Sequence, residues 1–258
     1  GEGRKMSKSL GNGVDPMDVI EKYGADALRW FLVTGSTPGQ DLRFTYEKMD
    51  SAWNFINKIW NASRYVIMNL DEDTPSTLPD MSQLTLADQW ILSRLNTVVT
   101  NVTRNFDKFE FGEAGRELYN FIWSDFADWY IEMTKETLNG DQDKAPVQQT
   151  LAYVLDQTLR LLQPIMPFVT EAIWQEMPAQ NGSEADFAIV KYPVVREELS
   201  NPDAEQAFKS LQDLIVAVRN IRAEANAPMS TPIDLMIQTT DDNLKHIFEA
   251  NADYINRF

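Results

Sequence analysis

The sequence contains no cysteine and a single histidine, His246, among its 258 residues. Without thiols, neither a disulfide bond nor a thiolate zinc site can form, and a reducing compartment is permitted. No apolar run reaches the roughly 18 residues that a membrane-spanning helix needs, and no segment has the pattern of a signal peptide. We therefore expect a cytoplasmic protein that has no membrane partner.

Positive charge is the next scarce feature. The chain has 23 Lys and Arg against 39 Asp and Glu, a formal net charge of −16. Such a balance disfavours binding to a phosphate backbone over the molecule as a whole. The charge is unevenly distributed, because residues 1–70 hold 9 basic and 8 acidic side chains whereas residues 71–258 hold 14 and 31. A site for a polyanion is therefore expected in the first quarter of the chain or in a local patch elsewhere.

Hydrophobic residues make up 43% of the chain, enough for one large core or two modest ones. Apolar positions recur three and four residues apart, with short connections, as in antiparallel helical bundles. The helices predicted on this basis cover residues 16–23, 25–34, 46–70, 87–106, 111–138, 147–163, part of 168–177, 202–225 and 241–250. Segments 187–193 and 231–240 favour short strands. The predicted fold is mainly α, a helical bundle preceded by a loop and linking helices and followed by a small, truncated α/β unit.

The strongest candidate for a functional site is residues 3–13, here called the lysine loop. Its sequence is Gly-Arg-Lys-Met-Ser-Lys-Ser-Leu-Gly-Asn-Gly. It places Lys5 and Lys8 three residues apart among small polar residues and glycines, with no apolar run that would bury it. Lysine ammonium groups are compact charges that can follow phosphate oxygens during an in-line displacement, and glycines let a loop open and close. The loop either handles a polyphosphate or is an ordinary solvated turn.

The predicted helix 46–70 has two unlike faces. Its apolar stripe has one small polar break and is formed by Met49, Ala52, Ile56, Ile59, Ser63, Val66 and Leu70. At about 100° per residue, the opposite line is formed by Asn54, Lys58, Asn61 and Tyr65, and it is flanked by Trp53, Trp60 and Arg64. This line is either a solvated face with incidental aromatics or a surface for unpaired bases, with rings for stacking, amides for base edges and cations for phosphates. The pattern alone leaves both interpretations open.

The string Lys5-Met6-Ser7-Lys8-Ser9, continued by Leu-Gly-Asn-Gly-Val-Asp-Pro, resembles the signature loop of the class I aminoacyl-tRNA synthetases that handle hydrophobic amino acids. The resemblance implies that the loop clamps ATP through Lys5, Ser7, Lys8 and Ser9, with Lys5 and Lys8 as catalytic residues. It implies that Lys8 stabilises the transition state in which the amino-acid carboxylate attacks the α-phosphate and pyrophosphate leaves. ATP, with Mg in the parent enzyme, would be a substrate, and no cofactor is expected on this chain itself.

Further blocks are similar to the valyl branch of that family. Residues 34–44 read Thr-Gly-Ser-Thr-Pro-Gly-Gln-Asp-Leu-Arg-Phe, and residues 57–65, Asn-Lys-Ile-Trp-Asn-Ala-Ser-Arg-Tyr, resemble the first helix of its anticodon-binding domain. The rest of the helical bundle is matched by residues 86–96, 122–130 and 162–174. The resemblance places Tyr65 against an anticodon base, with Lys58 and Arg64 as basic neighbours. The expected tRNA-binding residues are Tyr65, Arg64, Lys58, Asn61 and Asn54.

Three carboxylates, Asp125, Asp128 and Glu132, are spaced so that they would share one face of an α-helix. A di-iron bundle would need Glu-x-x-His pairs from its helices, and His246 lies in an unrelated segment. We therefore expect no metal site. The carboxylates are expected to pair with Lys or Arg across a helix interface or to be solvated, and His246 is expected to be a surface or partly packed residue, not a catalyst.

The order of these blocks predicts a C-terminal piece of a valyl-branch synthetase, a valine-tRNA ligase that activates valine with ATP and esterifies it to its tRNA. We expect the end of the catalytic domain at 1–44, the anticodon-binding bundle at 45–180, and a linker with a helix-strand-helix unit at 181–258. The expected partners are the tRNA anticodon stem-loop, valine and ATP, and the protein is expected to be a monomer. Alone, this piece should catalyse nothing, because one histidine cannot supply the family's His-x-Gly-His motif.

Two alternatives stay open. The chain could come from an isoleucyl- or leucyl-tRNA synthetase, which the best-competing tRNA anticodon would reveal. It could instead be a helical protein-interaction module whose acidic faces recruit a basic partner, with the lysine loop as a tail. Affinity for RNA should fall steeply with salt concentration, which separates RNA binding from the second alternative.

Overall fold

A computed structural model describes residues 3–180 and 186–258 of the chain. Residues 1–2 and 181–185, which include the start of the predicted third domain, lie outside the described residues. The described part is mainly helical and contains no strand, so the predicted helical fold is confirmed. Within it, no helix combines the length and the apolar character that crossing a membrane requires.

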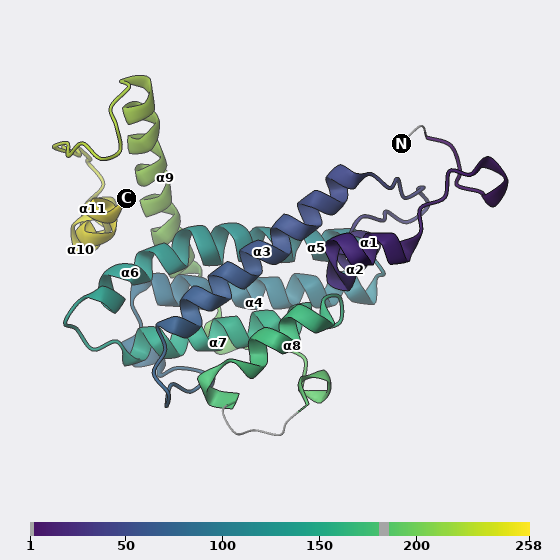
Figure 1. The fold of residues 1–258 in the computed structure, drawn as a ribbon. Helices are drawn as coiled ribbons and strands as arrows, with labels where there is room; N and C mark the ends of the chain where they lie inside the picture. The colour runs from purple at the N-terminus through teal and green to yellow at the C-terminus, as the bar shows by residue number, and fades with distance from the viewer. Residues whose placement is uncertain (1–2, 181–185) are drawn as a thin grey trace.

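The helices follow the predicted order closely. They are α1 (Pro16–Tyr23), α2 (Ala25–Thr34), α3 (Tyr46–Met68), α4 (Leu86–Asp107), α5 (Phe111–Asn120), the π-helix η3 (Phe121–Ile131), α6 (Glu132–Asn139), α7 (Ala145–Leu162), α8 (Pro167–Gln175), α9 (Pro202–Glu224), α10 (Asp242–Ala250) and α11 (Ala252–Arg257). Single 3-10 turns lie at η1 (Lys8–Leu10), η2 (Met81–Gln83), η4 (Pro178–Gln180), η5 (Phe187–Ile189) and η6 (Glu197–Leu199). The lysine loop projects at one end of the molecule, and α9 to α11 stand at the other (Figure 1).

Local sequence signals set several helix ends. Asp15 accepts a hydrogen bond from the Met17 amide at 2.9 Å, and Pro16 occupies the first position of α1, where its missing N–H costs nothing. Gly24 separates α1 from α2 with a φ of 87°, a conformation that glycine adopts without strain. Thr85 and Asp88 form a reciprocal capping box at the start of α4. These signals account for the accuracy of the predicted boundaries.

The core lies around α4, which packs against α5, α7, α9 and η3. Its buried apolar side chains include Trp90, whose ring stacks on Phe208 of α9 with centroids 3.9 Å apart. This contact attaches the base of α9 to the bundle, while the far part of α9 stands clear of it (Figure 1). On α3, the predicted apolar stripe is buried or partly buried throughout, and Phe55, which the stripe omitted, is fully buried as well.

Two side chains of α2 attach the linking helices to the bundle. The carboxylate of Asp26 accepts hydrogen bonds from the backbone amides of Phe168 and Val169 at 3.3 and 2.6 Å, at the start of α8. Arg29 donates to the carbonyl oxygens at positions 164 and 165, at the end of α7. Asp26 is buried and caps free N–H groups at a helix N-terminus, where a negative charge is favoured. The helices that carry the lysine loop are therefore held to the bundle by polar as well as apolar contacts.

Replacing Asp26 with alanine should lower the free energy of unfolding by about 2 kcal/mol, because it leaves two amides at the start of α8 without their acceptor. Thermal or urea denaturation of the purified chain measures this change. The matched control is Asp213→Ala, which removes an exposed carboxylate paired with Lys209 and should cost about 0.5 kcal/mol or less. Equal stability of the two variants would show that the contact between α2 and α8 contributes nothing.

The predicted helix 111–138 is right in extent and wrong in pitch. Its middle third is the π-helix η3, in which i to i+5 backbone hydrogen bonds replace the α-helical pattern; its buried side chains are Phe121, Ile122, Phe126, Tyr130 and Ile131. The α-helical spacing that put three carboxylates on one face therefore does not apply. The prediction failed because apolar residues around most of the segment do not distinguish one helical pitch from another.

Both predicted strands are absent from the described residues. The segment 187–193 begins with the turn η5, and residues 232–239 run without regular structure beside α10 and α11. A strand needs a neighbouring strand to pair its backbone, and the described part of the chain provides none, so alternation alone gave the wrong assignment. Arg222 of α9 is buried and donates to the carbonyls of Pro228 and Thr231 in the segment that follows the helix.

Candidate functional site

The lysine loop has an ordered internal geometry. The side-chain amide of Asn12 accepts a hydrogen bond from the Ser7 backbone amide at 2.9 Å and donates to the Lys5 carbonyl at 3.2 Å. Gly11 has a φ of 62°, and its backbone N–H donates a hydrogen bond to the carbonyl of Lys8. The chain from Lys5 to Asn12 therefore closes on itself, and these contacts lie within the loop.

The four residues assigned to ATP divide into two kinds. The Oγ atoms of Ser7 and Ser9 lie 3.2 Å apart, and that of Ser7 also accepts from the Leu10 amide, so both hydroxyls take part in the fold of the loop. Lys5 and Lys8 are exposed, and no ion pair among the described residues includes either of them. The loop thus presents two ammonium groups on a backbone that is fixed by hydrogen bonds within the loop. Asn12 was not identified from the sequence, although an Asn-Gly pair is a common sign of a turn.

The tRNA-binding residues predicted on α3 differ in their exposure and in whether they have a partner. Lys58 and Tyr65 face the helices beside α3. The Nζ of Lys58 donates to Asp128 of η3 at 2.9 Å and lies 5.0 Å from the ring centre of Trp123. Tyr65 is partly buried, with the Nζ of Lys135 5.4 Å from its ring centre. These two residues line the junction of α3 with η3 and α6, and each already has a partner.

The other three predicted residues, Asn54, Asn61 and Arg64, are exposed. Among the described residues, none of their side chains makes a hydrogen bond or an ion pair that would occupy it. Trp53 and Trp60, which the sequence placed beside the polar line, are each 45% exposed. Neither tryptophan is among the tRNA-binding residues predicted from the sequence. This outer face of α3 combines aromatic rings, amides and a guanidinium, all accessible to solvent.

The three carboxylates at 125, 128 and 132 pair with bases on three different elements. Arg94 of α4 donates to Asp125 at 3.1 Å, Lys58 of α3 reaches Asp128, and Arg257 of α11 donates to Glu132 at 2.8 Å. Burial raises the pKa of the Asp125 carboxyl, and the charge of Arg94 partly offsets this. The described residues hold no group of three or more potential metal ligands. The expectation of ion pairs across helix interfaces is confirmed, as is the exposed position of His246.

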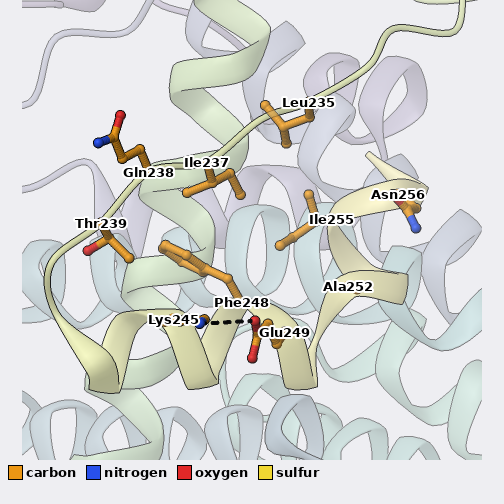
Figure 2. Close-up of a pocket in the computed structure, with 10 residues that line it drawn as sticks. All are labelled: Leu235, Ile237, Gln238, Thr239, Lys245, Phe248, Glu249, Ala252, Ile255 and Asn256. Atoms are coloured by element: carbon orange, nitrogen blue, oxygen red, sulfur yellow. Dashed lines mark ion pairs between the residues drawn. The ribbon is translucent and has the colours of Figure 1, made fainter.

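Two hollows lie at the C-terminal end of the described chain. The first, of about 460 Å³, lies between the segment 235–239 and α10 with α11. Figure 2 shows Leu235, Ile237, Phe248 and Ile255 pointing into it. The second, of about 530 Å³, is lined by polar residues of α6 and α11, with Lys135 among them. Neither hollow includes any residue predicted from the sequence to bind ATP or tRNA.

A family model described as the anticodon-binding domain of tRNA ligase matches residues 88–237, more than half of the chain. The chain belongs to this family. A second model, tRNA synthetases class I (I, L, M and V), matches residues 1–45, which contain the lysine loop. In this member of the anticodon-binding family, the first match begins within α4 and contains α5 to α9 entirely.

Proteins named valine-tRNA ligase are similar to this family member over its whole length. That of Lactiplantibacillus plantarum is 65% identical over 258 residues, and that of Latilactobacillus sakei is 62% identical over 260 residues. These matches cover 99% and 100% of this chain but only 29% of each relative, so the chain spans less than a third of their length. The crystal structure of a ternary complex of Agrobacterium radiobacter LeuRS, tRNA and LeuAMS matches with a TM-score of 0.62 and 23% identity, covering 77% of this chain and 23% of that one. This likeness supports the fold.

Proposed function

We propose that this chain is part of a valine-tRNA ligase, an enzyme that activates valine with ATP and esterifies it to its tRNA. The observation that carries the proposal is the identity of 65% and 62%, over essentially the whole chain, with proteins of that name. Within such an enzyme, this chain supplies the ATP-clamping loop and anticodon recognition. An isoleucyl or leucyl enzyme is not favoured, because relatives that are 59–65% identical to the chain are valine-tRNA ligases.

In the activation step, a carboxylate oxygen of valine bonds to the α-phosphorus of ATP while the bond to the leaving pyrophosphate breaks. The ammonium of Lys8, with Lys5 beside it, would neutralise negative charge that moves toward the leaving phosphates. The hydrogen bonds that fix the loop backbone support this role, because donors fixed before the reaction need no reorganisation during it. Mg is expected to arrive with the ATP phosphates as part of the substrate.

In anticodon recognition, an unpaired base would stack on Tyr65 while Lys58 and Arg64 neutralise phosphates and Asn54 and Asn61 meet base edges. The partly exposed ring of Tyr65 and the free amides of the outer face support this proposal. For Lys58 to reach a phosphate, its ion pair with Asp128 has to open. Its side chain is 28% exposed and that of Asp128 is 51% exposed, so solvent weakens the pair and opening it costs little.

Three finer points belong to the same proposal. The enzyme works in the cytoplasm, which the absence of cysteine permits. It acts as a monomer. This chain alone activates no valine, since its single histidine, exposed on α10, has no second histidine to work with.

Binding of the chain to a stem-loop with valine anticodon bases tests anticodon recognition. We expect tighter binding than to the same stem with a scrambled loop, and affinity that falls as salt rises. Tyr65→Ala should weaken binding about tenfold, because stacking of one base contributes about 1–3 kcal/mol, while Tyr65→Phe should keep most of it. Tyr254→Ala, which changes a partly buried tyrosine of α11, is the matched control. Equal binding of both loops would contradict anticodon recognition by this chain.

A further inference from the structure

Three large aromatic side chains form a line of half-exposed rings along α3. Tyr46 is 52% exposed, and Trp53 and Trp60 are each 45% exposed. They are spaced seven residues apart, which is close to two helical turns, so they lie on one face of the helix. Exposed aromatic surface of this extent on one face calls for an explanation, because soluble proteins seldom leave large apolar patches in solvent without a binding role.

This face is distinct from the junction that holds Lys58 and Tyr65. At about 100° per residue, the row of Trp53 and Trp60 lies roughly a quarter turn or more from those two side chains. Asn57 and Arg64 fall within the same row, and the Nζ of Lys22 lies 5.2 Å from the ring centre of Tyr46. Asp50, which accepts a hydrogen bond from the Tyr23 hydroxyl, also lies on this side of α3, and the Tyr46 ring packs against Tyr23 and Phe44. The row therefore combines rings with an amide, cations and one carboxylate, which distinguishes it from the aliphatic face of a helix that packs on protein.

The spacing also suits nucleic acid. Seven residues of helix rise by about 10.5 Å, which is about three steps of the roughly 3.4 Å that separates successive bases in a strand. Two consecutive unpaired bases could therefore stack between neighbouring rings of the row. The local charge permits an RNA partner, since residues 1–70 carry 9 basic and 8 acidic side chains while the rest of the chain is strongly acidic.

We propose that Tyr46, Trp53 and Trp60 form a second stacking row for unpaired bases of the tRNA anticodon loop, separate from the Tyr65 junction. The proposal rests on the proposed function for the identity of the RNA. Asn57 and Arg64 contact base edges and the phosphate backbone along this row. Bases on both sides of the anticodon triplet would then be held by the outer face of α3.

The test measures binding of the 258-residue chain to the valine stem-loop and to a fully paired hairpin of equal length and charge. Trp53→Ala with Trp60→Ala should weaken stem-loop binding by about 10- to 100-fold, because each base stacked on an aromatic ring contributes about 1–3 kcal/mol, and should leave hairpin binding unchanged. Trp53→Phe with Trp60→Phe should retain most of the affinity, since a smaller ring can still stack. Met68→Ala, which removes an exposed non-aromatic side chain of α3, is the control and should have no effect.

The outcomes separate this inference from the proposed function. If Tyr65→Ala weakens stem-loop binding and both double tryptophan variants bind like the parent chain, the stacking row is wrong and anticodon recognition stands. If the alanine variants weaken hairpin and stem-loop equally, the row does not select unpaired bases and is overturned. Failure of the parent chain to distinguish the two RNAs would overturn both, and would favour a protein partner for this face. A circular dichroism melt confirms that each variant is folded.

Discussion

Replacing Lys8 with alanine in the full-length enzyme should lower kcat for valine-dependent ATP-pyrophosphate exchange by about 100-fold or more, the usual effect of removing one group that stabilises transition-state charge. The effect should fall on kcat more than on the KM for ATP, because in the proposed role Lys8 meets negative charge that develops only as the α-phosphate is attacked. Lys8 begins the turn η1, whose start is capped by the Ser7 hydroxyl, so the backbone that carries its ammonium is fixed. The measurement is steady-state exchange with each substrate varied.

The matched control is Lys209→Ala, which removes an exposed lysine of α9 paired with Asp213 and should leave exchange unchanged. Lys8→Arg should recover only part of the activity, because a planar guanidinium does not reproduce a compact ammonium. Asn12→Ala should lower kcat by a smaller factor, since it removes the amide that joins Ser7 to Lys5 and leaves both lysines in place. An unchanged kcat in Lys8→Ala would contradict its role, whereas absence of exchange in the parent enzyme would contradict the proposed reaction.

The helices were predictable from the sequence because their signals are local. The cap at Asp15 and Pro16 and the glycine at position 24 act within a few residues, and the apolar periodicity of α3 and α7 is sustained over several turns. The strand predicted at 231–240 depended on a partner elsewhere, which alternation along one segment cannot reveal. Local signals thus gave the elements, while features that require a second segment were missed.

In the candidate site, too, local signals identified the helix, whereas the surroundings of its side chains depend on other segments. The sequence identified α3 and its polar residues, but its helical projection centred the binding face on the line of Lys58 and Tyr65. The structure places Lys58 and Tyr65 of that line against η3 and α6, where Asp128 and Lys135 are their partners, and leaves Asn54 and Asn61 accessible, as it does Trp53 and Trp60. The direction in which a helix faces depends on the helices that pack against it, and here one of those is a π-helix that the sequence pattern did not distinguish from an α-helix.

The largest expected loss of stability comes from the buried pair of Asp88 and Tyr130. The Tyr130 hydroxyl donates to the Asp88 carboxyl at 2.6 Å, and these residues are 0% and 1% exposed. Asp88 also accepts from the Thr85 amide to complete the capping box of α4. Asp88→Ala should lower the free energy of unfolding by about 3–4 kcal/mol, because it leaves the buried Tyr130 hydroxyl and the partly buried Thr85 amide without their acceptor and removes a helix cap. Urea denaturation measures it, with Asp213→Ala as the exposed control.

A double-mutant cycle with Tyr130→Phe distinguishes the hydrogen bond from the packing around it. Removing both partners should cost less than the sum of the two single changes, because no buried hydroxyl is then left without its acceptor. Additive losses would show that the two groups act independently.

The stability that Asp88 contributes should depend on pH. Burial raises the pKa of Asp88, although hydrogen bonds from Tyr130 and Thr85 oppose this. The folded state therefore holds the carboxyl proton more tightly than the unfolded state, in which the pKa is near 3.8. Its contribution is therefore complete below that value and declines as the pH rises through the raised folded pKa. The loss caused by Asp88→Ala should be larger in acid than at neutral pH, and the raised pKa of Asp125 cancels from this difference because both proteins retain that residue.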